Sequence, residues 1–237
     1  MSPSDDDLDA LGAVGALAEP HRRRLYEIVV VARRWMSRDE AAAASGLGRS
    51  VASHHLDRLA DDGLLEVDYR RMNDRRGPGA GRPAKVYRRA PTEVAVHLPP
   101  RDYELAGRIL AEATDVARRD RTPIDDAVRD AARRVGVEIG RSARSRMEGR
   151  SRREARRAVV EELRERGFEP ESVLDGRVIL HNCPFHHLAQ EHTDLICGMN
   201  LCVFNALIDE LGTASLSARL EPDPEQCCVQ LVEDAAP

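Results

Sequence analysis

All five cysteines of this 237-residue chain lie in one C-terminal stretch, which also holds four of its eight histidines. Cys183 comes first, Cys197 and Cys202 follow, and Cys227 and Cys228 close the series. Thiolate sulfur and imidazole nitrogen are the donors that hold zinc and iron–sulfur clusters. The residue types therefore predict an inorganic site, and the chain must fold so that sulfurs far apart in sequence meet.

We expect the ligands of this site to be three thiolates and one imidazole or other donor. The candidates are Cys183, His186, Cys197, Cys227 and Cys228. Their spacing is not the CxxC pair of a zinc ribbon, so an iron–sulfur cluster and zinc both stay open. The fourth ligand also stays open, as does the choice between the two adjacent cysteines.

One imidazole stands out among the histidines of this stretch, because His186 lies one helical turn from Cys183. The weaker alternatives are His187, His181 and His192. Cys202 lies off the helical face of Cys197, so we expect it to be a small buried hydrophobe and not a ligand. A Cys–His enzyme using Cys183 with His186 is a further hypothesis, but no oxyanion, phosphate or nucleotide motif accompanies the pair. We expect no enzyme.

Charge divides the chain into a basic and an acidic part. Residues 21–90 carry 16 Arg and Lys against 9 Asp and Glu, whereas residues 158–237 carry 4 against 15. A polyanion is attracted to the first part and repelled by the second. The net charge of −5 therefore hides a basic module that suits double-stranded DNA.

Targeting signals are not evident. The N-terminus is acidic and lacks the basic region of a signal peptide, and no stretch approaches the roughly 20 apolar residues of a membrane span. We expect a cytoplasmic protein with no membrane partner, whose cysteines stay reduced and form no disulfide framework.

The pattern of elements predicts four regions. They are a flexible N-terminus over 1–18, a DNA-binding domain over 19–90, a linker and helical dimerisation region over 91–166, and a Cys/His-containing α+β sensor domain over 167–237. The fold class is mainly α with α+β parts. In the last region we expect strands over 177–182, 216–220 and 227–232, and helices over 184–190 and 194–211.

A winged helix-turn-helix is predicted for 19–90. Helices are expected over 20–35, from a capping box at Ser37–Glu40, and over 49–62, ended by Gly63. Alternating segments over 64–70 and 85–89 predict a β-hairpin. Three helices followed by a hairpin match the order of a winged module.

The third of these helices is expected to enter the major groove, and the hairpin to contact the backbone or the minor groove. Ala52, His55, Leu56 and Leu59 are expected to face inward, with Asp57 on the opposite side. The candidate DNA contacts are Arg49, Ser50, Ser53, His54, Arg58, Arg70, Arg71, Arg75, Arg76, Arg82 and Lys85.

The segments EPHRRRLY, SHHLDRL and GLLE resemble the sequence pattern of ArsR-like winged-helix regulators over about residues 17–90. That resemblance implies a homodimer on a partly palindromic operator. The segments NCPFH, ICGMN and CCV behind it are similar to the SufR-like branch, which is associated with iron–sulfur clusters. It implies Cys183, Cys197 and one of Cys227 and Cys228 as ligands. The chain departs from that pattern, because no cysteine lies between Cys202 and Cys227.

The sequence therefore predicts a transcriptional regulator, expected to be a repressor, whose affinity for its operator depends on the cluster. A regulator with structural zinc, and one that senses a small molecule in the middle helices without metal, are the alternatives.

Overall fold

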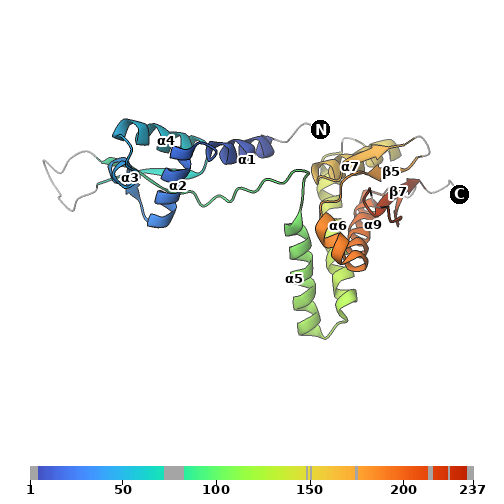
Figure 1. Cartoon of the computed structure of the whole chain (residues 1–237). Helices are drawn as coiled ribbons and strands as arrows, with labels where there is room; N and C mark the ends of the chain where they lie inside the picture. The colour runs from blue at the N-terminus through green and yellow to red at the C-terminus, as the bar shows by residue number, and fades with distance from the viewer. Residues whose placement is uncertain are drawn as a thin grey trace. The chain divides into compact units, whose positions relative to one another are not determined.

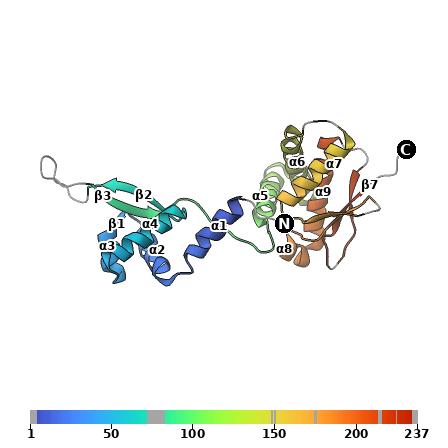
Figure 2. The ribbon, with the colours of Figure 1, turned by 90° about the horizontal axis from the view of Figure 1, so that it is seen from above.

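The structure is a computed structural model and describes residues 5–71, 83–147, 149, 151–173, 176–212, 216–223 and 225–233. It is mixed α+β, with two small antiparallel sheets (Figures 1 and 2). The chain divides into two compact units, Met1–Val96 and His97–Pro237. The expected fold class, mainly α with α+β parts, agrees with this architecture.

The N-terminal unit combines helices with a three-stranded sheet. Its elements are α1 (Asp5–Ala16), α2 (Pro20–Ala32), β1 (Met36–Ser37), α3 (Arg38–Ser45), α4 (Arg49–Asp61), β2 (Leu65–Arg70) and β3 (Ala84–Arg89). Ser37 and Glu40 form the predicted capping box. Gly63 has a φ of +74°, a left-handed conformation that glycine adopts without a Cβ penalty, and it ends the turn after α4.

The sheet of this unit has the order β1-β3-β2 with antiparallel pairing, and Tyr69 lies opposite Lys85. Leu25, Leu56, Leu59 and Tyr87 are fully buried and join α2, α4 and β3 in one core. This core fixes α4 against the sheet through its Leu56 and Leu59 side.

The segment at residues 5–16 is helical, although we expected a flexible N-terminus there. Ala13 and Ala16 of α1 are buried in the core of the N-terminal unit. Small side chains at these positions let the helix approach the core closely. Composition alone therefore understated the order of this segment.

The C-terminal unit places helices beside a four-stranded sheet. Its elements are α5 (Tyr103–Asp120), α6 (Ile124–Ser145), α7 (Arg152–Glu165), β4 (Pro170–Ser172), β5 (Val178–Leu180), α8 (His186–Glu191), α9 (Thr193–Leu211), β6 (Leu216–Leu220) and β7 (Val229–Glu233). The strand order is β4-β5-β7-β6. Residues from both of the expected regions, 91–166 and 167–237, share one hydrophobic core in this unit.

Helices α6 and α9 lie side by side at the centre of this unit (Figures 1 and 2). Two glycines of α6 make the close approach feasible. A Cβ on Gly136 would lie 2.7 Å from the Ala206 Cβ, and one on Gly140 would lie 2.7 Å from the Glu210 Cβ. The path of α9, which carries Cys197, thus depends on the absence of side chains on α6.

Strand β7 begins later than we expected. Cys227 and Cys228 lie just before the strand and not within it, because the first pairing of β7 is that of Val229 with Leu220. The buried alternation nevertheless extends backward, since Cys227, Val229 and Leu231 are all buried.

Candidate metal centre and candidate nucleic-acid interface

Three short segments of the C-terminal unit bring the cysteines together. Cys183 follows β5, Cys197 lies near the start of α9, and Cys227 and Cys228 precede β7. The backbone N–H of Cys227 donates to Leu180 O at 2.8 Å, which fixes the last segment beside the end of β5. A main-chain hydrogen bond thus places Cys227 next to the strand that precedes Cys183.

The sulfur atoms fall into two pairs. Cys197 and Cys228 form a disulfide with a Cα–Cα distance of 6.4 Å. This corrects the expectation that all cysteines stay reduced. Cys183 and Cys227 are free, buried thiols that share a hydrogen bond. Residues far apart in sequence thus meet, as the composition predicted, but two of their sulfurs are bonded to each other.

A cavity of about 400 Å³ adjoins both pairs. Its lining includes Cys183, Cys197, Cys228 and His186, together with Asp223 and Gln226. Cys227 contacts the group through its hydrogen bond with Cys183. Four of the five candidate ligands therefore line one cavity, and Cys227 adjoins it through Cys183.

The two free thiols differ in acidity. The hydrogen bond with Cys227 lowers the pKa of Cys183, and the Phe185 N–H and the Arg101 guanidinium act in the same direction. The same hydrogen bond and burial raise the pKa of Cys227. The shared hydrogen bond therefore makes Cys183 the more acidic thiol of the pair.

Asn200 is a contributor that the sequence reasoning missed. Its side chain is buried, and Nδ2 donates to the Cys227 sulfur at 3.7 Å. Asn200 lies almost one helical turn after Cys197 on α9, and its Oδ1 has no hydrogen-bond partner among the described residues. A buried polar residue at that spacing from a candidate ligand was the available signal.

The loop at Cys183 is tied to the start of the C-terminal unit. Asn182 Nδ2 donates to Pro100 O at 3.0 Å and to Gly167 O at 2.5 Å. Arg101 Nη1 donates to Asn182 Oδ1 at 2.5 Å and to Cys183 O at 3.3 Å. The Asp102 N–H donates to Pro184 O at 3.2 Å. Residues 100–102 and 182–184 thus form one hydrogen-bonded assembly.

The remaining candidates of the stretch lie elsewhere. His181 Nε2 is 2.7 Å from Glu171 Oε2 and is engaged by that carboxylate. His187 packs its ring beside His186 with centroids 5.5 Å apart. Cys202 is half-buried and lines a separate cavity between α6 and α9.

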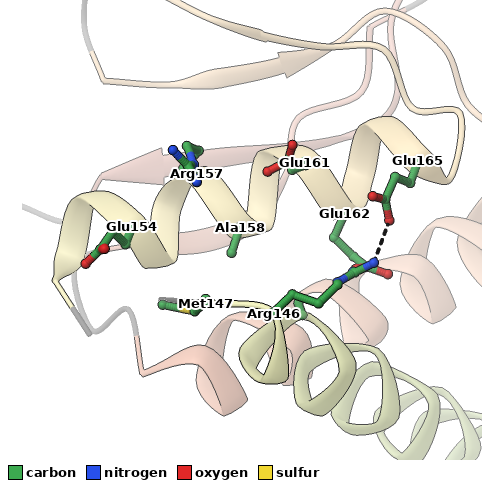
Figure 3. Close-up of a pocket in the computed structure, with 9 residues that line it drawn as sticks. Arg146, Met147, Glu154, Arg157, Ala158, Glu161, Glu162 and Glu165 are labelled. Carbon is green, nitrogen blue, oxygen red and sulfur yellow. Dashed lines mark hydrogen bonds and ion pairs between the residues drawn. The ribbon is translucent and has the colours of Figure 1, made fainter. Parts of the chain in front are cut away.

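A charged cavity of about 320 Å³ lies between α6 and α7 (Figure 3). Its buried Glu162 pairs with Arg146 and with Arg166, the latter at 2.9 Å, and Arg146 also reaches Glu165 at 3.1 Å. The arginines compensate the buried carboxylate. This cavity therefore belongs to the packing of α7 against the end of α6.

The predicted outward face of α4 is accessible. Arg49, Ser50, His54 and Arg58 are exposed, and Ser53 is half-buried. Only a three-residue turn, 46–48, separates α3 from α4. The N-terminal part of α4 thus offers a polar face to a partner, on which Arg49 pairs with Asp39 at 2.6 Å.

Asp57 differs from its expected outward position, because it faces β3. Asp57 Oδ1 accepts hydrogen bonds from Lys85 Nζ at 2.5 Å and from the Tyr87 hydroxyl at 2.7 Å. Desolvation opposes these bonds, but they lower the pKa of Asp57. Lys85, expected as a DNA contact, is therefore held by a carboxylate of α4.

The hairpin arginines are partly engaged with an aromatic ring. Arg70 and Arg88 lie 4.4 and 4.6 Å from the centroid of Trp35, in cation–π geometry. Arg71 is exposed. Arg75, Arg76 and Arg82 lie outside the described residues.

One further group of ligand-type side chains lies in the N-terminal unit. Among the described residues, Glu19, His21 and His55 bring their ligand atoms within 4.8 Å of one another. His55 was expected to face inward and is half-buried. The sequence reasoning missed this group, since its members come from α4 and the start of α2, and only the fold brings them together.

The chain matches no protein-family model, no curated protein and no solved structure in comparisons with known proteins. None of the described helices is long and apolar enough to cross a membrane.

Proposed function

We propose that the protein is a DNA-binding transcriptional regulator whose operator affinity depends on a metal group held by the cysteine centre. The observation that carries the proposal is the order of elements in the N-terminal unit. Helices α2, α3 and α4, with β1 between the first two, are followed by the antiparallel strands β2 and β3. A short turn between α3 and α4 and a hairpin after them are the components of a winged helix-turn-helix.

The surface of this unit supports contact with DNA. Helix α4 exposes Arg49, Ser50 and His54 near its N-terminus, which is the part of a recognition helix that meets base edges. Arg70 and Arg71 lie at the end of β2, where a wing begins. Contacts of these arginines with phosphates predict an affinity that falls steeply with salt.

The cysteine centre fits an iron–sulfur cluster or zinc by its donors. Cys183, Cys197, Cys228 and His186 offer sulfur and imidazole donors around one cavity, and Cys227 is hydrogen-bonded to Cys183 beside it. A cluster would supply a group sensitive to oxidation, whereas zinc would supply a structural crosslink. Cys197 and Cys228 ligate only as thiolates, so their disulfide must be reduced before both can bind metal.

We also propose a homodimer on a partly palindromic operator. Helix α5 is strongly two-sided and packs chiefly on α6 through Leu105, Ile109 and Ala113. Its opposite face is exposed along the helix and is the surface that we propose for pairing with a second copy.

The test begins with selection of binding sites from random duplex DNA by the full-length protein, followed by mobility shifts on the selected sequence. We expect Arg49→Ala and His54→Ala to weaken binding at least about tenfold, given roughly 1–3 kcal/mol for a good base contact. Arg153→Ala, an exposed arginine of α7, is the matched control and is expected to bind as the wild type does. Selection that enriches no sequence would refute the proposal.

The metal arm uses protein purified anaerobically with a thiol reductant, with iron and zinc counted per chain. We expect bound metal, its loss in Cys183→Ser and Cys197→Ser, and a change of operator affinity when a chelator removes it. Iron with visible absorption identifies a cluster, whereas colourless zinc that is lost in both cysteine variants identifies the alternative. Operator binding that is unaffected by metal and by both substitutions would contradict control by this centre.

A further inference from the structure

Two histidines and one glutamate of the N-terminal unit converge at the junction of α2 and α4. His21 Nδ1 lies 2.9 Å from Glu19 Oε1, and His55 Nδ1 lies 3.7 Å from Glu19 Oε2. The two imidazole rings stack with their centroids 5.9 Å apart. One ring nitrogen of each histidine therefore lies within 3.7 Å of the carboxylate.

A capping role explains only part of this arrangement. Glu19 is the N-cap of α2, and its carboxylate accepts from the N–H of His21 at 3.1 Å and of Arg22 at 2.7 Å. This capping uses backbone N–H groups and requires neither imidazole ring. Each carboxylate oxygen has two lone pairs, so both retain a site for a further partner after capping.

His55 supplies the second, independent observation. Its side chain is 14% exposed, and Nδ1 is a buried atom with no hydrogen-bond partner among the described residues. A buried ring nitrogen without a partner costs free energy. A cation between this nitrogen and Glu19 would satisfy both atoms at once.

We propose that Glu19, His21 and His55 form a zinc site in the N-terminal unit, separate from the cysteine centre. Two imidazole nitrogens and one carboxylate oxygen are a ligand set that zinc takes in proteins, with the fourth position left to water. The exposed side of the site, at His21, gives the ion access from solvent. The proposal depends neither on the cysteine centre nor on DNA binding.

The location gives the ion a defined mechanical role. Glu19 and His21 belong to the start of α2, and His55 to the middle of α4. An ion held by all three links the start of α2 to the middle of α4. Zinc binding is therefore expected to stabilise the packing of α4 on α2.

The experiment follows the N-terminal unit alone within the full-length protein. Trp35 is the single tryptophan of the chain, so its fluorescence reports the thermal unfolding of this unit and not of the cysteine centre. At a hundredfold excess of Zn²⁺ over its Kd we expect the midpoint to rise by about 10 °C. His21→Gln, which changes an exposed side chain, is expected to abolish the rise without disturbing the fold, as is His55→Gln.

The matched control is His54→Gln, the neighbouring histidine on α4, which is expected to keep the full zinc response. Co²⁺ serves as a second probe, because a nitrogen and oxygen site gives weak visible bands without the intense thiolate absorption that cysteine ligands add. His21→Gln should remove one equivalent of Co²⁺ and leave the thiolate absorption unchanged. A Trp35 midpoint that does not respond to Zn²⁺, or that responds equally in His21→Gln, would overturn the site.

Discussion

Because α6 and α9 are in close contact, we expect replacement by alanine to have opposite effects on stability at two helical glycines. Both Gly136 in α6 and Gly107 in α5 are inside helices, where replacing glycine by alanine gains about 1 kcal/mol of helix propensity. A Cβ on Gly107 meets nothing within 4 Å, so Gly107→Ala is expected to stabilise the C-terminal unit by about 0.5–1 kcal/mol.

A Cβ on Gly136 would meet the backbone of Val203 and would lie 2.7 Å from the Ala206 Cβ. Carbon atoms prefer separations of about 3.5–4 Å, so α6 and α9 must move apart. The obstacle is backbone and a methyl group, neither of which can rotate away. The cost should therefore reach the upper part of the roughly 1–3 kcal/mol range for overpacking and exceed the gain in propensity. We expect Gly136→Ala to destabilise the unit by about 2 kcal/mol.

The assay is amide hydrogen exchange along α9 together with urea unfolding followed by circular dichroism. Tryptophan fluorescence is unsuitable for this unit, because Trp35 lies in the other one. Faster exchange in α9 of Gly136→Ala, with slower or unchanged exchange in Gly107→Ala, is the expected pair of results. Equal stabilisation by both substitutions would refute the reasoning from helix contact.

Three further results are expected. Because the pKa of Asp57 is lowered in the folded state, its carboxylate contributes stability above about pH 4, and this stability is lost as the pH falls through the folded-state pKa. Asp57→Asn should therefore reduce the loss of stability at acid pH, followed by Trp35 fluorescence. An unchanged pH dependence would count against the Asp57 contacts. Arg146→Ala removes one partner of buried Glu162 and should lower the free energy of unfolding, measured in urea, by about 1–3 kcal/mol. Adding Glu162→Leu should restore most of this stability, and a double variant as unstable as Arg146→Ala would show that the unpaired charge is not the cause. Arg70→Ala should lower the fluorescence-detected midpoint by the equivalent of about 0.5–1 kcal/mol, and a midpoint equal to that of the wild type would exclude a stabilising ring contact.

Local signals in the sequence predicted much of the fold. The Ser37–Glu40 capping box and the left-handed Gly63 appear as expected, because each depends on interactions within a few residues. The strand over 216–220 also appears with the expected bounds. The start of β7 was misplaced, since strand boundaries depend on partners elsewhere in the chain. The order of α1 was missed for the same reason, as its alanines pack on a core built by other elements.

The candidate centre was predicted in composition but not in chemistry. The convergence of Cys183 with the later cysteines follows from ligand-type residues gathered in one region. The pairing of Cys197 with Cys228 was beyond reach, because disulfide partners are set by the separation of Cα atoms in the fold. The group of Glu19, His21 and His55 has no spacing motif, since its members meet only through the packing of α2 on α4.

The hydrogen-bonded assembly of residues 100–102 with 182–184 has a mechanical consequence. The chain enters the C-terminal unit at residue 97, a few residues before Pro100 and Arg101 accept and donate these bonds. Any displacement of the loop that bears Cys183 must either drag this entry segment with it or break the bonds of Asn182 and Arg101. The segment that connects the two units is thus hydrogen-bonded to the loop that carries Cys183, a candidate ligand. A displacement of that loop therefore acts directly on the connecting segment.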